Sequence, residues 1–300
     1  MDELDFGISR FLLGNSRTPL SEMARELDTT VQTIHRRVRS MEEEGIIENY
    51  VAKLSPRILG STQVLIFGWS RTPSYREVAK RLGEHDATNM MMVASGNFLY
   101  IDGMLRNSME LDGFVSFIRE KAEMPSPTVG LTMPFLPMKR LADVPAMSST
   151  DDSILRLLLN DARKPTSEIA EELGISAKTV RRRMSRMVEE DLVRFGMLWH
   201  PDRSTETIAQ VHLDLREDMD PQNVMFSLVK LIGPRLLFSF AFSNMPRLVI
   251  PMVWSNSNRE MNDSVRKLED EGVFTSVVQH HVIDAFYYSD WREETLRKRI

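Results

Sequence analysis

The stretch RTPLSEMAREL at positions 17–27 decides how this 300-residue chain is organised, because it returns as RKPTSEIAEEL at positions 163–173. The two copies align without a gap at an offset of 146 residues, with 13 identities in the 28 positions from 17 to 44. A period of this length indicates duplicated domains, since the repeats of a solenoid are much shorter. We therefore expect two copies of one unit.

The first fifty residues of each copy carry the apolar spacing of helices. Apolar side chains recur three and four residues apart over 4–12 and 20–27, and over the equivalent parts of the second copy. A third helix is expected to begin at Thr30 and at Ser176, because both are good N-caps. Short β-prone runs follow at 46–51 and 192–197. Three short helices and a hairpin predict winged helix-turn-helix domains at 1–56 and 150–202.

The remainder of each copy has the alternating pattern of strands. Apolar and polar residues alternate strictly over 209–215, as in a half-buried strand. Strand and helix patterns then continue in the order β-α-β-β-α-β, which predicts ferredoxin-like domains at 60–138 and 206–288. A linker with Pro145 and two serines is expected at 139–149, and a charged C-terminal tail at 289–300. The predicted fold class is α+β, with two repeats that each join a winged helix-turn-helix to a ferredoxin-like βαββαβ domain.

Composition restricts the classes of protein to be considered. Lys and Arg number 38 against 43 Asp and Glu, a net charge of −5, so any nucleic-acid surface must be a local basic patch. Cys is absent, which excludes disulfides and thiolate metal sites. No apolar run approaches the roughly 18–20 residues that span a bilayer, and the acidic N-terminus does not resemble a signal peptide. We expect a cytoplasmic protein.

The motifs resemble those of the Lrp/AsnC (feast/famine) family of prokaryotic transcriptional regulators, here in a tandem duplicated form. The resemblance is carried by the Leu-Asp start at 4–5, by the helix at 17–27, and by TIHRRVRSMEEEGII at 33–47. It implies a DNA-binding regulator whose α/β domains sense amino acids and mediate assembly. The chain departs from the family by carrying two complete units. The hairpin glycine of the family is matched by Gly96, whereas SNMPR at 243–247 replaces it in the second copy.

The third helices are the predicted DNA-binding elements. No carboxylate occurs between 30 and 41 or between 176 and 187. A major groove admits one helix, Arg pairs with guanine and Gln with adenine, and Lys and Arg neutralise phosphates. The alternative is that such a run is only a solvated helix face. The predicted DNA-binding residues are Gln32, Thr33, His35, Arg36, Arg37, Arg39, Lys178, Thr179, Arg181, Arg182, Arg183 and Arg186.

The family resemblance also implies a small-molecule effector, such as an amino acid, beside the hairpin turn formed by Ser95, Gly96 and Asn97. The alternative is that residues of these types form only a turn. No metal site is expected, because His280 and His281 point to opposite faces of a strand and the other histidines have no partners at ligand spacing. We also expect no cofactor and no enzymatic activity, since phosphate-binding and nucleophile motifs are missing.

Two other functions remain open. The two-domain unit also resembles the subunits of sirohaem decarboxylase, in which paired α/β domains hold a tetrapyrrole and histidines assist. The basic third helices argue against this enzyme, because it does not need them. The other alternative is an architectural chromatin protein that binds all DNA sequences alike.

The α/β domains are expected to pair, either within the chain or between chains. The runs at 64–69 and 236–242 are continuously apolar, which indicates strands covered on both faces. The α/β domains have also diverged further than the helical domains, as distinct interfaces would require. On this ground a homodimer through the α/β domains is slightly favoured over pairing within one chain.

Overall fold

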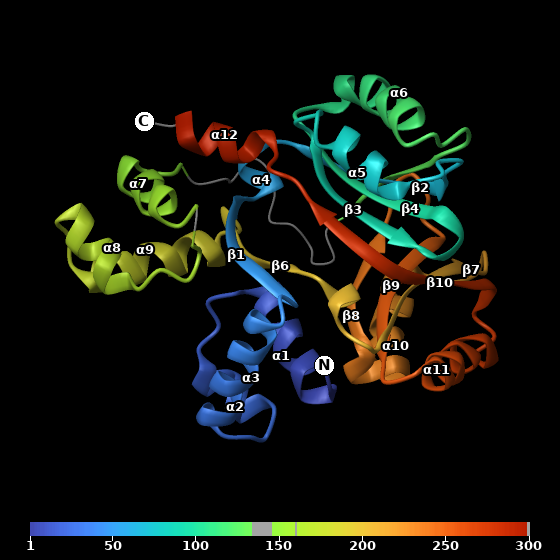
Figure 1. Cartoon of the computed structure of the whole chain (residues 1–300), viewed down its shortest axis with the longest axis horizontal. Helices are drawn as coiled ribbons and strands as arrows, with labels where there is room; N and C mark the ends of the chain where they lie inside the picture. Colours follow the sequence, from blue (N-terminus) through green and yellow to red (C-terminus); the bar gives the residue numbers. More distant parts are fainter. Residues whose placement is uncertain (134–145, 160, 299–300) are drawn as a thin grey trace. The chain divides into compact units, whose positions relative to one another are not determined.

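A computed structural model describes residues 1–133, 146–159 and 161–298, so residues 139–145 of the predicted linker lie outside the described residues. The fold is mixed α/β, with antiparallel sheets and helix-turn-helix domains, and it divides into two compact units (Figure 1). No helix in the described residues is long and apolar enough to cross a membrane.

The first unit is formed by the described parts of Met1–Phe6, Thr62–Pro137 and Pro201–Tyr288. Both copies contribute four strands and two helices to it in the order expected from the sequence. The first copy provides β2 (Thr62–Trp69), α5 (Tyr75–Leu82), β3 (Thr88–Ala94), β4 (Phe98–Leu105), α6 (Leu111–Lys121) and β5 (Thr128–Leu131). The second provides β7 (Thr207–Leu215), α10 (Pro221–Ile232), β8 (Leu236–Ala241), β9 (Leu248–Ser255), α11 (Asn258–Asp270) and β10 (Phe274–Tyr287).

The eight strands form one antiparallel sheet in the order β5-β2-β4-β3-β10-β7-β9-β8. The junction between the copies is possible because β10 is 14 residues long. Its first part pairs with β7, and its last part pairs with β3, from Val282 opposite Ala94 to Tyr287 opposite Met90. The expected pairing of the α/β domains is confirmed. It occurs within the chain, and the homodimer slightly favoured from the sequence stays a prediction.

Each half of the sheet has one face covered by its own helices. Helices α5 and α6 pack on the first half of the sheet, and α10 and α11 pack on the second (Figure 1). Each pair of helices covers its own apolar core. On the opposite face, aromatic rings of the two halves contact each other, as Phe67 does with both His212 and Phe242. Strand β2 is therefore buried on both faces, as predicted, whereas most of β8 is only half-buried.

The two edge strands of this sheet are joined by the segments that follow them. Thr132, after β5, bridges Phe242, after β8. The Asn244 side chain donates to the carbonyl of Val129 and accepts from the amide of Leu131, both at 2.8 Å. The 243–247 segment replaces the hairpin glycine of the family. Its first residues, Ser243 and Asn244, bind β5 and so join the two edges of the sheet.

The second unit holds the helical domains of both copies, from the described parts of Gly7–Ser61, Met138–His200 and Ser289–Ile300. The first copy provides α1 (Glu3–Gly14), which belongs to this unit from Gly7 onward, and then α2 (Leu20–Glu26), α3 (Val31–Glu43), β1 (Ile47–Leu54) and α4 (Pro56–Leu59). The second provides α7 (Ser149–Leu157), α8 (Thr166–Leu173), α9 (Ala177–Glu189), β6 (Val193–Trp199) and the C-terminal α12 (Trp291–Lys298).

The expected hairpin of each copy is replaced by a single strand. β1 and β6 pair with each other in antiparallel fashion, with Ala52 opposite Phe195, and form a two-stranded sheet shared by the two copies. The prediction of separate hairpins was wrong because β1 runs for eight residues without a turn. Each strand therefore takes its partner from the other copy.

The C-terminal segment is a packed helix, although its composition predicted a charged tail. In α12, Trp291, Arg292 and Leu296 are buried, and the helix contacts β1 and α7. The Arg292 guanidinium donates to the buried Asp290 carboxylate at 3.0 Å, and Lys53 of β1 lies 3.6 Å from the same group. Burial alone would raise the pKa of Asp290, but these cations outweigh it and hold the pKa below its ordinary value.

Candidate nucleic-acid interface

The third helices, α3 and α9, begin at the two residues predicted to cap them. The hydroxyl of Thr30 accepts from the amide of Thr33, and that of Ser176 accepts from the amide of Thr179, each at 3.1 Å. Thr33 and Thr179 also bond their hydroxyls to those of the caps, at 2.9 Å. Because both threonines already take part in the cap, they are half-buried and add little to the outer surface.

Four exposed side chains form a stripe along the first three turns of each helix, and Val31, Glu42, Glu43, Val188 and Glu189 are exposed as well. The stripe positions are i, i+3, i+4 and i+7, which lie on one face of an α-helix. The stripes correspond residue for residue at the offset of 146, and they are Gln32, His35, Arg36 and Arg39 on α3, and Lys178, Arg181, Arg182 and Ser185 on α9. The opposite face is buried in both copies, by Ile34, Val38 and Met41 and by Val180, Met184 and Met187.

Three of the predicted DNA-binding arginines lie elsewhere. Arg37 and Arg183, at equivalent positions, are half-buried, and so is Arg186. Arg183 donates to the Asp151 carboxylate at 3.1 Å, and Arg186 donates to it at 2.8 Å. These two side chains connect α9 to the first turn of α7, and their predicted contact with DNA stays a prediction.

Asp151 is fully buried and shares its oxygens between two tasks. With Ser148 it forms the capping box of α7, and its carboxylate also pairs with Arg183 and Arg186 of α9. Burial alone would raise its pKa, but the hydrogen bonds from Ser148 and Arg183 outweigh this and hold the pKa of the carboxyl below its ordinary value. The sequence signal was present, because a Ser-x-x-Asp capping pattern precedes the apolar run.

The two stripes differ in chemistry. The stripe on α9 carries three cations, Lys178, Arg181 and Arg182, whereas that on α3 carries Gln32, His35, Arg36 and Arg39. Arg39 also pairs with Glu43 one turn later, at 2.8 Å, and both side chains are exposed. An exposed pair of this kind is worth at most about 1 kcal/mol, so Arg39 can exchange Glu43 for another anion.

The helical domains of both copies match known families. Residues 147–188 match the AsnC-type helix-turn-helix domain, and residues 1–48 match a winged helix-turn-helix DNA-binding domain. The HTH-type transcriptional regulator LrpA of Pyrococcus horikoshii is 34% identical over 100 residues, which cover 33% of this chain and 71% of that protein. This chain belongs to the Lrp/AsnC family. LrpA of Pyrococcus abyssi is similar over the same shares of both chains, at 35% identity.

One solved structure is similar to this Lrp/AsnC chain over nearly its whole length. It is the crystal structure of the siroheme decarboxylase NirDL, with a TM-score of 0.58 and coverage of 99% of this chain and 98% of that one. The sequence identity is 14%, so the likeness concerns the fold.

The turn expected to hold an effector in this Lrp/AsnC chain is exposed and bonded to its own surroundings. Ser95, Gly96 and Asn97 form a short 3-10 turn between β3 and β4, in which Gly96 has φ 73°. A left-handed φ of this kind favours glycine. Asn97 donates its side-chain amide to the carbonyl of Thr72 and accepts from the amide of Ser70, both at 2.9 Å. These contacts explain the turn without a ligand.

The first unit of this Lrp/AsnC chain also contains a cluster that the sequence analysis missed. The Tyr100 hydroxyl lies 2.7 Å from Nε2 of His212, whose ring is 4.9 Å from that of His280. His280 also stacks on Phe98 at 4.1 Å. Burial lowers the pKa of His212 to about 4, with a smaller effect from His280, and burial also lowers the pKa of His280. Both rings are therefore neutral at pH 7.

The strand register explains why the histidines meet. His280 on β10 lies opposite Gln210 on β7, and His212 is two residues further along the same face. The alternation of both strands was visible in the sequence, but their register was not. Within the described residues, no group of three or more histidines and carboxylates could hold a metal ion.

Proposed function

We propose that the chain is a sequence-specific DNA-binding transcriptional regulator in which the exposed stripes of α3 and α9 enter major grooves. The observation that carries this proposal is the pair of matching, carboxylate-free stripes on equivalent helices of an acidic protein. Arg and Lys at such positions contact base edges and phosphates. Membership of the Lrp/AsnC family supports the same function.

The proposed architecture is a fused pair of units, each with a winged helix-turn-helix and a ferredoxin-like βαββαβ domain. Its support is the strand order, since both halves of the large sheet place their four strands in the order fourth, first, third, second. The proposed domains keep the boundaries expected from the sequence, except that 289–300 is assigned to the helical unit through α12. A small-molecule effector such as an amino acid is part of the proposal, and family membership is its support.

The test begins with selection of bound duplexes from a random DNA pool. The Arg181→Ala/Arg182→Ala variant should then bind the selected site more weakly, with a shallower salt dependence, because each lost phosphate contact lowers the slope by about 0.9. The matched control is Arg259→Ala/Arg266→Ala, which removes two exposed arginines from α11. Equal affinity of all three proteins for the selected DNA would remove the proposal, and a flat affinity across sequences would favour an architectural protein.

A second candidate function is a tetrapyrrole enzyme like sirohaem decarboxylase. The observation that favours it is the contact between the half-buried His212 and the buried His280 among aromatic rings, in a chain whose fold resembles NirDL from end to end. Neutral imidazoles are suitable iron ligands, because the ring nitrogen has a free lone pair. Titration with an iron tetrapyrrole should shift its Soret band in the wild type and not in His212→Ala/His280→Ala. An unshifted band in the wild type would exclude this function.

A further inference from the structure

In the helical unit, a loop of the second copy lies against the first. The amide of Ala162, between α7 and α8, donates to the carbonyl of Tyr50 on β1 at 3.1 Å. Arg17 of the first copy donates Nη1 to the carbonyls of Ala162 and Lys164, at 2.6 and 3.0 Å. These bonds hold the backbone on both sides of Arg163.

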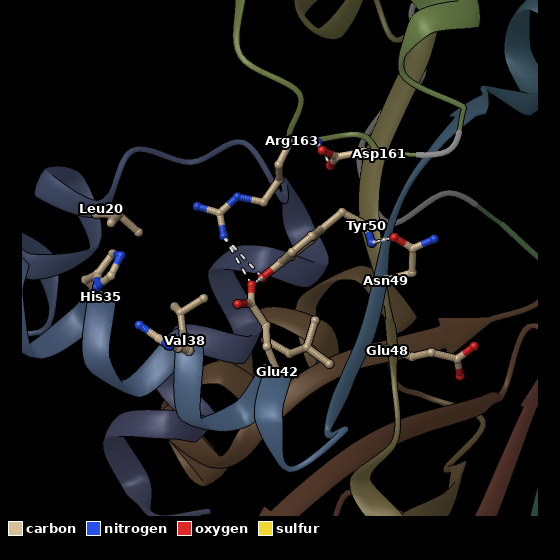
Figure 2. A pocket seen from close by; sticks show the side chains of 11 residues that line it. Leu20, His35, Val38, Glu42, Glu48, Asn49, Tyr50, Asp161 and Arg163 are labelled. Carbon is tan, nitrogen blue, oxygen red and sulfur yellow. Dashed lines mark hydrogen bonds and ion pairs between the residues drawn. The ribbon is translucent and has the colours of Figure 1, made fainter.

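Arg163 extends over β1 into a cleft of about 690 Å³ beside α3 (Figure 2). Its guanidinium lies over the ring of Tyr50, 4.8 Å from the centroid, and Nη1 donates to the Tyr50 hydroxyl at 3.1 Å. That hydroxyl donates in turn to Oε1 of Glu42 at 2.5 Å. Burial raises the pKa of Tyr50, and the bond to Glu42 raises it further, so the phenol keeps its proton and remains a donor.

The chain of contacts ends on the recognition helix. Glu42 lies in the last turn of α3, three residues after Arg39 of the exposed stripe, and Arg39 and His35 line the same cleft. Residues three apart are neighbours on a helix surface. A contact that holds Glu42 therefore restrains the end of α3 from which the stripe is presented.

The second copy has only part of this network. The amide of Ser16, which corresponds to Ala162, donates to the carbonyl of Phe195 on β6 at 2.9 Å, and the Arg17 guanidinium lies 6.0 Å from the centre of the Phe195 ring. At the offset of 146, Glu42 corresponds to Val188 and Tyr50 to Gly196, neither of which has a side-chain group that can hydrogen-bond. Arg163 corresponds to Arg17, whose Nη1 donates to backbone carbonyls. The orientation of α3 thus depends on a hydrogen-bonded relay of side chains from both copies, whereas the contact of Arg17 with Phe195 has no such relay to α9.

We propose that Arg163 of the second copy is a positioning residue for DNA recognition by α3 of the first copy. This inference rests on the proposed function. The guanidinium acts through Tyr50 and Glu42 and does not itself contact a base. Base discrimination by α3 of the first copy therefore requires an intact loop between α7 and α8 of the second copy. Discrimination by α9 does not depend on Arg163.

The test uses the full chain and its selected DNA site. The half-site of α9 is identified as the one whose protection is lost in Arg181→Ala/Arg182→Ala. A mismatched base pair costs about tenfold or more in affinity in a specific complex. In Arg163→Ala, we expect this penalty to fall at least threefold in the half-site of α3 and to stay unchanged in that of α9.

Two further variants separate positioning from other roles. Arg163→Lys keeps the charge but loses the planar guanidinium stacked on Tyr50, so it should behave like Arg163→Ala. Tyr50→Phe removes only the hydroxyl and should weaken discrimination in the same half-site, which keeps the test valid if Arg163→Ala does not fold. Rescue by lysine, with a salt slope about 0.9 lower in Arg163→Ala, would identify a phosphate contact and overturn the inference.

The two failures can be told apart. A wild-type chain that selects no DNA contradicts the proposed function. A wild-type chain that selects a site, with unchanged discrimination in the half-site of α3 for Arg163→Ala and Tyr50→Phe, contradicts only the role of Arg163.

Discussion

At the scale of single residues, neighbouring arginines of one helix have different tasks. Arg182 is exposed on the stripe of α9, while Arg183 is turned toward α7 and bonded to the buried Asp151. A contact to a buried carboxylate is worth more than an exposed one, because an unpaired buried charge retains its full desolvation cost. Sequence position alone does not distinguish the two residues.

This division predicts that two adjacent substitutions change the stability of the chain by different amounts. Arg182→Ala should change the free energy of unfolding by no more than about 0.5 kcal/mol, since its side chain is exposed. Arg183→Ala should lower it by about 1–3 kcal/mol, with Arg186 still neutralising Asp151. Urea denaturation of both variants measures the difference. Equal stabilities would show that the contact between Arg183 and Asp151 has no structural role.

The half-buried His212 predicts a dependence of stability on pH. His212 has a pKa of about 4 in the folded chain against an ordinary value of 6.5, so below pH 6.5 the unfolded chain binds a proton that the folded chain does not. Stability should therefore be fully present above pH 6.5 and fall as the pH drops toward 4, by roughly 3 kcal/mol at most. Unfolding midpoints at pH 7.5 and 5 measure this loss, and His212→Gln should reduce it. A wild type equally stable at both pH values would contradict the prediction.

At the scale of elements, the junction between the two edge strands depends on one glycine. A Cβ on Gly130 of β5 would lie 2.2 Å from the ring of Phe242. The absence of this atom lets Phe242 lie against the strand, beside the bridge to Thr132. The segment that closes the sheet therefore requires a residue without a side chain at position 130.

We expect Gly130→Ala to lower the free energy of unfolding by about 1–3 kcal/mol, because the ring of Phe242 must move out of its place. The matched control is Gly113→Ala in α6, where a Cβ meets nothing within 4 Å. That substitution should stabilise the chain by roughly 0.5–1 kcal/mol, since glycine is unfavourable inside a helix. Thermal denaturation of the two variants decides the matter, and a Gly130→Ala protein as stable as the wild type would show that the junction is open in solution.

At the scale of the whole molecule, one chain supplies both members of each expected pair. The strands that join the α/β domains, and the strands that join the helical domains, come from its two copies. An unpaired edge strand is the usual route to association through a sheet, and the large sheet has its edges joined. A single chain therefore carries two helix-turn-helix domains without a second chain.

Light scattering in solution should accordingly report the mass of one chain, in place of the homodimer expected from the sequence. The selected DNA sites should be non-palindromic, because Gln32 and His35 of α3 correspond to Lys178 and Arg181 of α9, and side-chain type sets base preference. A two-chain mass together with a palindromic footprint would contradict this account of the assembly.

The sequence by itself determined the features that depend on local spacing. The caps at Thr30 and Ser176, the apolar stripes of the third helices and the order of helices and strands along each α/β domain follow from residues within a few positions of one another. Such patterns are legible because one helix face or strand face repeats at a constant interval. The duplication was legible for the same reason, since both copies retain the spacing.

Only the tertiary structure decided which distant residues meet. The partners of Arg183 and Arg186, the pairing of β1 with β6 and the contact of His212 with His280 depend on strand register and on helix packing across long sequence separations. A one-residue change of register would turn a histidine to the other face of its strand, and no local signal specifies that register. The packing of α12 was not predicted, because its three buried residues stand among many charged ones and the apolar spacing of a helix is therefore weak. These contacts form because the complete fold removes apolar surface from water. The segments that share this surface are far apart in the chain, so no short stretch of sequence specifies the contacts.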